Sequence, residues 1–189
     1  MSKQIVPLLL LVAFLAISCS TKKPEPKKNS FAPVFEAYKK TLTEKRINDI
    51  QLIESIPALS LTTLDGKEIE VGHGGSRPAV IIFFTTWCPV CERALPQIDL
   101  ALDKELRRKV SVIAVGREHT EAELHVWRKM TGNTLDVVAD PTKDIYLQFA
   151  DKIIPRIYLI DGNGNVIYQD VGWNERIQGL LFQAIESLQ

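Results

Sequence analysis

Two continuous apolar runs stand out in the hydropathy pattern of the chain, over residues 79–84 and 110–115. Both are rich in β-branched and aromatic residues, which is typical of strands that are buried on both faces of a sheet. Helical spacing and strand-like alternation predict the elements around them. These are helices over 120–131 and about 174–188, a short helix over 144–149, and strands over 156–160 and 166–171.

The residues before the first apolar run predict a helix and a hairpin. Apolar residues recur at roughly helical spacing over 31–53, which predicts one amphipathic helix that ends before Pro57. Residues 59–71 alternate between apolar and polar types around Asp65-Gly66, a dipeptide typical of tight hairpin turns. Because strands and helices alternate along the chain, the predicted fold is an α/β domain with a mixed sheet.

The first thirty residues have the pattern of an export signal followed by a tether. Lys3 precedes an apolar run over 5–17 that is too short for a membrane-spanning helix, and Ser18 stands before Cys19. The stretch LAISC resembles a bacterial lipobox, in which the cysteine carries lipid. The alternative is an ordinary signal peptide with an incidental cysteine. Residues 21–30, TKKPEPKKNS, have the composition of a solvated linker.

The predicted organisation has four parts. They are a signal peptide (1–18), a lipidated Cys19 with a flexible tether (19–30), an N-terminal helical segment (31–56) and the main domain (57–189). A chain of 189 residues has room for one domain of ordinary size. Lysine plus arginine and aspartate plus glutamate number 23 each, so the composition does not indicate a nucleic-acid-binding protein.

Cys88 and Cys91 are the strongest candidates for chemistry. Cys88 follows the predicted strand 79–84, and Pro89 suits the first position of a helix, so Cys88 should lie at a helix N-terminus. There the free backbone N–H groups and the helix dipole lower the pKa of a thiol and make it a better nucleophile. Cys91 should lie on the same helical face, within reach of a disulfide.

The cysteine pair has three possible uses: a metal site, a structural staple or a redox centre. A metal site needs about four ligands, and the chain has no second cysteine pair. A disulfide across three residues constrains the unfolded chain little, which argues against a staple. We favour redox chemistry and predict no metal. The three histidines, His73, His119 and His125, are expected to be surface or loop residues.

A wider set of motifs resembles the thioredoxin superfamily. The motifs are WCPVC after an apolar strand, Pro96 five residues beyond Cys91, and IIPRIYLIDGNGNVIYQDVGW. The hairpin before the central strand is similar to that of the exported TlpA/ResA-like branch, and the resemblance covers about residues 57–189. It implies a thioredoxin-like fold, with a mixed central sheet flanked by helices and an N-terminal β-hairpin extension.

The resemblance also implies roles for individual residues. Cys88 would attack substrate disulfides, Cys91 would resolve the mixed disulfide, and Pro155 would be a cis-proline packed beside them. The backbone next to Pro155 would be free to pair with a substrate strand. Pro96 matches the proline that kinks the active-site helix, and Gly172 matches the glycine that flanks the substrate groove.

We expect an apolar rim around Cys88 that suits an extended or unfolded protein substrate. Ile154 and Trp173 have an alternative place in the core, and Arg156, directly after the predicted cis-proline, is expected to be solvated. The predicted substrate-binding residues are Trp87, Pro89, Val90, Ile154, Gly172 and Trp173.

Two positions depart from the family pattern. Thioredoxin has a buried aspartate six residues before its first cysteine, where this chain has Ile82. Many ResA-like proteins have a glutamate three residues after the second cysteine, where this chain has Ala94. Glu92 is nearby, but its position should turn it to another face of the helix. We expect water or a more distant acid to carry the proton.

The predicted activity is thiol–disulfide exchange on exported proteins. Pro89 and Val90 stand between the cysteines, so the cationic histidine that stabilises the thiolate of strongly oxidising relatives is lacking. We therefore predict a reductant or isomerase rather than an oxidant, with no cofactor. A membrane-bound thiol donor would recharge it. The predicted location is the bacterial cell envelope, as a lipoprotein that faces the periplasm.

Two other functions remain open. A thiol peroxidase would use one reactive cysteine, and Thr85 precedes Cys88 by three residues as in peroxiredoxins, although Ile81 stands where those enzymes have proline. A binding module could use the same fold as a scaffold or carry copper on the two sulfurs. Consumption of peroxide or stoichiometric retention of copper would distinguish these functions from disulfide exchange.

Overall fold

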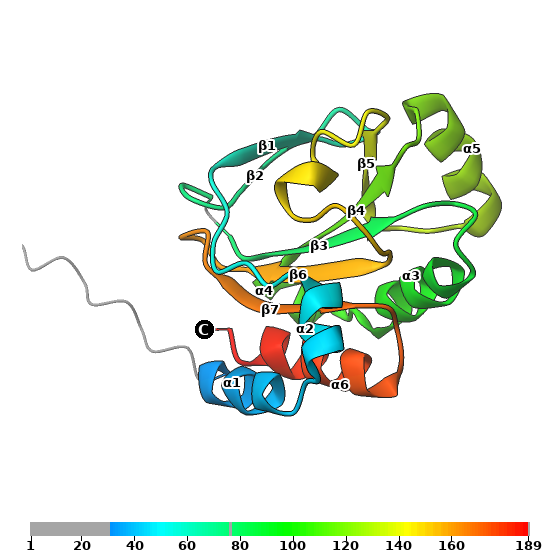
Figure 1. The fold of residues 1–189 in the computed structure, drawn as a ribbon. Coiled ribbons are helices and arrows are strands. Elements are labelled where there is room, and N and C mark those ends of the chain that lie inside the picture. The colour runs from blue at the N-terminus through cyan, green and yellow to red at the C-terminus, as the bar shows by residue number, and fades with distance from the viewer. Residues whose placement is uncertain (1–30, 76, 189) are drawn as a thin grey trace, which may run out of the picture.

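The structure is a computed structural model that describes residues 31–75 and 77–188 (Figure 1). The predicted signal peptide, the lipidated Cys19 and the tether lie outside the described residues. Within the described ranges, none of the helices has the length and the apolar character needed to cross a bilayer.

A mixed sheet forms the centre of the fold, as the sequence predicts, and it has five strands, one more than predicted. Its strands are β3 (Ala79–Phe84), β4 (Ser111–Arg117), β5 (Asp136–Asp140), β6 (Arg156–Ile160) and β7 (Val166–Val171). They lie in the order β5-β4-β3-β6-β7. β3, β4 and β5 are parallel, whereas β6 and β7 are antiparallel to their neighbours. β3 lies in the middle and is buried along its whole length.

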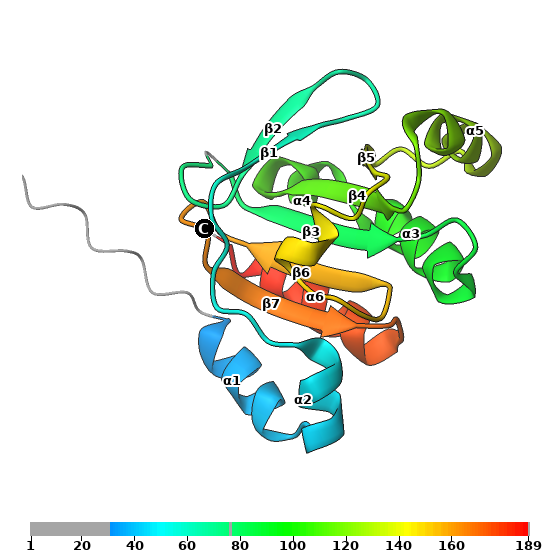
Figure 2. The ribbon, with the colours of Figure 1, turned by 45° about the horizontal axis from the view of Figure 1, so that its top comes forward.

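Different elements cover the two faces of the sheet (Figures 1 and 2). Ile82 and Phe84 of β3 point to one apolar cluster, and Ile81 and Phe83 point to the other. The first cluster lies under α3 (Pro89–Ala101), α4 (Lys104–Lys109), α5 (Glu121–Thr131) and α6 (Glu175–Glu186). The second lies under the N-terminal hairpin and a short 3-10 helix, Tyr146–Gln148, where the sequence predicts a short helix.

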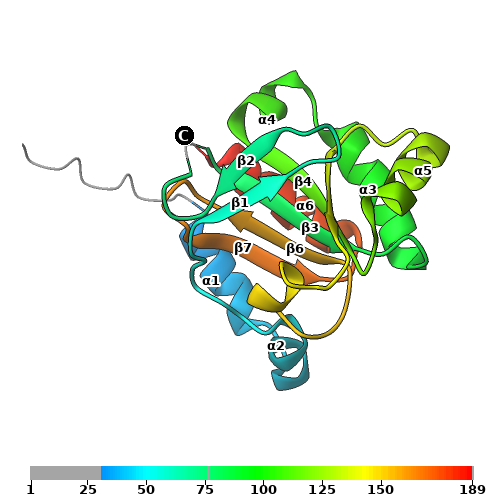
Figure 3. The ribbon, with the colours of Figure 1, turned by 90° about the horizontal axis from the view of Figure 1, so that it is seen from above.

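The predicted hairpin is present as a separate two-stranded sheet, β1 (Leu59–Thr62) and β2 (Glu68–Val71). Its strands are antiparallel, with Leu61 opposite Ile69. Gly66 has a φ of 74°, a left-handed conformation that glycine adopts without steric cost. Seen from above in Figure 3, the hairpin lies across the central sheet, and its apolar side chains belong to the second cluster.

The prediction of one helix over 31–53 was wrong, because the structure has two. They are α1 (Ala32–Lys40) and α2 (Glu44–Ile50). The Thr41 hydroxyl donates a hydrogen bond to the Tyr38 carbonyl at 2.8 Å, and Thr43 caps α2 by accepting the Arg46 N–H at 3.3 Å. Side chains of this type compete with the helical backbone for hydrogen bonds and favour a break followed by a new start.

Two elements were absent from the prediction. β5 pairs with β4, with Val138 opposite Val115, but its five residues begin and end with aspartate, which hides the apolar pattern. α4 follows α3 after a break and is capped by Asp103, whose carboxylate accepts the Leu106 N–H at 2.8 Å. Both elements are short, and short elements give weak periodic signals.

Candidate active site

Cys88 caps the N-terminus of α3, as the sequence predicts. The chain leaves β3 and makes a turn in which the Cys88 N–H donates to the Thr85 carbonyl at 3.3 Å. It then enters the helix at Pro89, whose missing N–H is not needed in the first turn. The Sγ of Cys88 accepts the N–H of Cys91 at 3.2 Å. This contact places a backbone donor on the sulfur where a thiolate would form.

The two cysteines form a disulfide, with their Cα atoms 5.2 Å apart. The exposed fraction is 6% for Cys88 and 1% for Cys91. Cys88 is therefore more buried than expected for the attacking residue, but it is still the more accessible of the two. Cys91 is carried one helical turn inward, into the apolar cluster under α3.

Three loops meet at the end of the sheet that carries the cysteine pair. Phe83 is opposite Arg156, so the start of β6 lies beside the end of β3. The peptide bond between Ile154 and Pro155 is cis, as the family resemblance implies. The Gly172 N–H donates to the Pro155 carbonyl at 2.8 Å, which joins the loop after β7 to the proline loop.

The predicted rim residues differ in their exposure. Trp87 is 65% exposed, and Pro89 is also exposed. The indole N–H of Trp173 donates to the side-chain oxygen of Gln97 on α3 at 2.5 Å, which fixes this ring beside the active-site helix. Three rim residues are half-buried and pack against the cluster that contains both cysteines, namely Val90, Ile154 and Trp173.

The expectation that Arg156 is solvated was wrong, because its side chain is fully buried. The guanidinium donates to the carbonyls of Asp49 at 2.8 Å and Ile50 at 2.5 Å, where α2 ends. It also donates to the side chain of Gln51 at 2.8 Å and to the carbonyl of Lys152 at 2.8 Å. A cation at a helix C-terminus is favoured by the helix dipole. Arg156 thus ties α2 to the loop that precedes β6.

The two positions that lack the family carboxylates are apolar and buried. Ile82 and Ala94 both have 0% exposure and belong to the cluster around the cysteines. Glu92 is exposed on α3, as expected for a residue on another face of the helix. The immediate surroundings of Cys91 are therefore apolar on the sheet side.

Asp170 is a buried carboxylate on the same face of the sheet. Ile82 is opposite Ile157, which is opposite Asp170, so the carboxylate lies two strands from Ile82, or roughly 10 Å at the usual strand spacing. Asp170 accepts a hydrogen bond from the Tyr38 hydroxyl and forms an ion pair with Arg46. Burial and this hydrogen bond raise the pKa of Tyr38 to about 12. The contacts anchor α1 and α2 on β7.

His119 belongs to the site, although its place in the sequence did not suggest so. It lies in a loop, as expected, but it is only 7% exposed, and its Nε2 accepts the Thr86 N–H at 3.0 Å. Thr86 is two residues before Cys88. Parallel neighbouring strands end at one edge of a sheet. Because His119 follows β4 and Cys88 follows β3, this topology is the signal that could have found the histidine.

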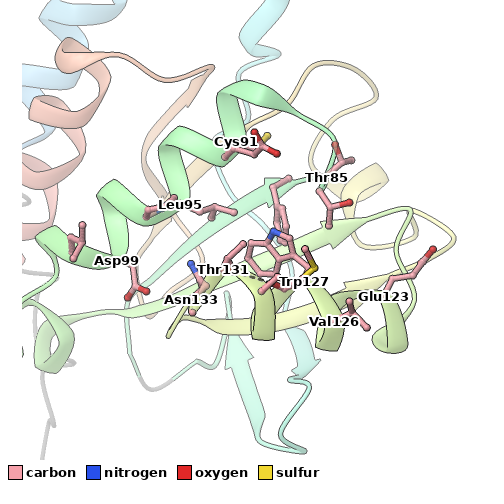
Figure 4. A pocket seen from close by; sticks show the side chains of 16 residues that line it. Thr85, Cys91, Leu95, Asp99, Glu123, Val126, Trp127, Thr131 and Asn133 are labelled. Atoms are coloured by element: carbon pink, nitrogen blue, oxygen red, sulfur yellow. Dashed lines mark hydrogen bonds between the residues drawn. The ribbon is translucent and has the colours of Figure 1, made fainter.

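A groove of about 680 Å³ runs between α3 and α5, with Cys91 at one end (Figure 4). Phe84 and Trp127 pack inside it with their ring centroids 4.7 Å apart. Val126 and Met130 on its border are 60% and 82% exposed. The groove is separate from the proline loop, because no residue of that loop lines it.

The mixed sheet, the cysteine pair at a helix start and the cis-proline at the same end of the sheet define a thioredoxin-like thiol–disulfide oxidoreductase. The sequence profile of the Redoxin family matches residues 51–180, and the chain belongs to this family. The site acts by thiol–disulfide exchange through Cys88 and Cys91.

Similar proteins agree with this classification. The chain is 26% identical to the thiol-disulfide oxidoreductase ResA of Bacillus thuringiensis (strain Al Hakam) over 134 residues, which are 70% of this chain and 78% of that protein. A candidate protein disulfide isomerase from Bacteroides thetaiotaomicron is 28% identical, with a TM-score of 0.64 over 71% of this chain and 87% of that one. The exposed lipoprotein thioredoxin of Streptococcus pneumoniae strain TIGR4 is 24% identical, with a TM-score of 0.58 over 70% of this chain and 100% of that one.

Proposed function

We propose that the protein reduces or isomerises disulfide bonds of exported proteins, with Cys88 as the attacking residue and Cys91 as the resolving residue. The observation that carries this assignment is the difference between the two sulfurs. Cys88 is the more exposed and has a backbone N–H donor on its Sγ at the start of a helix. Cys91 lies one turn further, where it reaches Cys88 but is closed to a large substrate.

In the reducing direction, the exchange has two steps. The Cys88 thiolate attacks one sulfur of a substrate disulfide, and the other substrate sulfur leaves as a thiolate and takes up a proton. Cys91 then loses its proton and attacks Cys88 Sγ, which releases the second substrate sulfur and leaves Cys88 and Cys91 joined. Two electrons have passed to the substrate, and a membrane-bound thiol donor would return them.

An extended polypeptide would bind along the proline loop. In the part of the chain that the structure describes, the peptide N–H and carbonyl of Ile154 have no hydrogen-bond partner, so they are available to a substrate strand. Main-chain pairing of this kind holds a peptide with little dependence on its side chains. Apolar contacts would come from Trp87 and Pro89 on one side and from Trp173 beside Gly172 on the other.

The reducing or isomerising direction follows from the residues between the cysteines. Pro89 and Val90 place no positive charge beside Cys88, so the thiolate is stabilised mainly by the helix terminus and the Cys91 N–H. Less stabilisation of the reduced form makes a pair a weaker oxidant. Isomerisation needs the same attack by Cys88, followed by attack of a substrate thiol on the mixed disulfide.

Export and membrane attachment through a lipid on Cys19 complete the proposal. The support is the apolar run and the lipobox-like LAISC in the sequence, together with the likeness to an exposed lipoprotein thioredoxin. An extracytoplasmic location also suits the substrate, because disulfides form and persist in oxidising compartments.

Substrate trapping tests the proposal. In cells that carry a Cys91→Ser variant, the first step should proceed and the second should not, so Cys88 should accumulate mixed disulfides with exported proteins that dithiothreitol releases. A Cys88→Ser variant is the matched control and should trap nothing. The assignment fails if the Cys91→Ser variant forms no such adducts, or if the Cys88→Ser variant forms them instead.

A further inference from the structure

One hydrogen bond to a buried histidine holds the turn that leads into Cys88. The Thr86 N–H donates to His119 Nε2 at 3.0 Å, and the Cys88 N–H closes the same turn on the Thr85 carbonyl. We propose that His119 is a positioning residue for thiol–disulfide exchange: its neutral ring fixes the Thr85–Cys88 turn, and protonation of the ring releases it. The inference rests on exchange at Cys88 and applies to either direction of electron flow.

The contact with Thr86 determines where the histidine carries its proton. A backbone amide is always a donor, so Nε2 must present its lone pair to the Thr86 N–H. The proton of the neutral ring therefore sits on Nδ1. This atom is buried and has no hydrogen-bond partner among the described residues. Protonation adds a hydrogen to Nε2, which sets two donors against each other at 3.0 Å and removes the acceptor of the turn.

The charges around the ring favour a proton on Nδ1. The nearest carboxylate is that of Glu123, with Oε2 3.8 Å from Nδ1. Hydrogen bonds from the N–H and hydroxyl of Thr120 hold this carboxylate in place and lower the pKa of Glu123, which favours its charged form.

Other charged groups lie on neighbouring segments of the chain. Arg117 is the last residue of β4 and forms an ion pair with Glu118, which also pairs with Lys143 of the turn after β5. Glu92 of α3 lines the same groove as Thr86 and Glu123. Cys88 and Cys91 are further titratable groups near this turn once they are reduced.

The turn matters because it sets the position of Cys88 relative to α3. The Sγ of Cys88 accepts the Cys91 N–H at 3.2 Å only while Cys88 is held at the helix N-cap. A released turn would weaken this contact and lower the fraction of thiolate. We expect about a fivefold slower reaction of the Cys88 thiol, the effect of losing one ordinary hydrogen bond.

Two substitutions of His119 distinguish the effect of its hydrogen bond from the effect of the space that its side chain fills. Glutamine can place its side-chain oxygen near the position of Nε2 and does not titrate, so His119→Gln should keep the acceptor at every pH. His119→Leu fills the space but accepts nothing. All variants are made in a Cys91→Ser background. The assay measures the rate at which iodoacetamide modifies Cys88 in the reduced full chain from pH 8 to pH 5, and peptide mass spectrometry quantifies the product. No protein substrate is involved, so the result is independent of the trapping experiment.

At pH 8 the parent and His119→Gln should react at the same rate, and His119→Leu about fivefold more slowly. As the pH falls, the ratio of the parent rate to the His119→Gln rate should drop toward about one fifth. The amide resonance of Thr86 should shift over the same pH range in the parent and stay in place in His119→Gln.

Three results would overturn the proposal. They are a rate ratio that stays at one down to pH 5, a His119→Gln variant as slow as His119→Leu at pH 8, and a His119→Leu variant as fast as the parent. If His119→Leu does not fold, the ratio of parent to His119→Gln alone decides.

Discussion

Replacement of Arg156 by methionine tests how the N-terminal helices are joined to the active-site end of the sheet. Methionine keeps the apolar stem of the side chain and removes its donors. Arg156 makes close hydrogen bonds to four oxygens, on Asp49, Ile50, Gln51 and Lys152. Three of these belong to residues that are partly or fully exposed, so water can replace the guanidinium there. Ile50 is 1% exposed, and its carbonyl would lose its partner.

The expected cost follows from these contacts. A buried acceptor left without a partner costs about 1–3 kcal/mol, and the other charge-assisted bonds add about 1 kcal/mol after exchange with water. Relief of the buried charge offsets part of this loss. We expect Arg156→Met to lower the free energy of unfolding by about 2–3 kcal/mol, which corresponds to a Tm about 5–10 °C lower for a chain of this size.

The assay is urea unfolding of the oxidised protein, followed by tryptophan fluorescence and circular dichroism. Arg108→Met is the matched control, because Arg108 forms an ion pair with Glu105 in which both side chains are at least 70% exposed. Exposed pairs contribute about 0–1 kcal/mol, so this control should change stability little. A loss below about 1 kcal/mol for Arg156→Met, or a loss equal to that of the control, would refute the role assigned to the buried guanidinium.

Three further predictions concern the thiols, the buried tyrosine and the membrane. In the reduced protein near pH 7, iodoacetamide should modify Cys88 at least about tenfold faster than Cys91; equal rates would reverse the assignment of the attacking residue. The raised pKa of Tyr38 favours the protonated folded state, so unfolding free energy should fall between about pH 10 and pH 12. In urea titrations, Tyr38→Phe should show a smaller fall in unfolding free energy over this pH range. A fall as large as that of the parent would contradict this origin. Cys19→Ala should move the protein from the membrane to the soluble fraction of cells. A parent protein found in the soluble fraction would contradict attachment through Cys19.

The cysteine pair and the strands other than β5 could be predicted because their signals are local. β3 and β6 are runs of apolar residues, and Pro89 after Cys88 marks a helix start within two residues. The break between α1 and α2 was missed for the opposite reason. Apolar residues continue at helical spacing across it, since both helices pack toward the same edge of the sheet, and the capping role of Thr43 is only one hydrogen bond.

Arg156 and His119 could not be placed from local sequence. An arginine at the start of a strand is ordinarily solvated, and three of its four close acceptors here lie more than 100 residues earlier in the chain. His119 is 33 residues from its partner Thr86. Arg156 and His119 are buried only because the fold packs a segment that is distant in sequence against each side chain. Polar residues of this kind depend on tertiary contacts, which hydropathy patterns do not record.

The contacts of two buried charges tie residues 31–56 to the rest of the described domain. Arg156 and Asp170 lie in β6 and β7, but Asp49, Ile50, Tyr38 and Arg46 supply their partners from α1 and α2. A shortened chain that begins at Pro57 would keep both charges and lose these partners. A chimera that takes the redoxin part of this chain and the N-terminal residues of a relative would therefore need residues 31–56 as well, or apolar replacements of similar size at both positions.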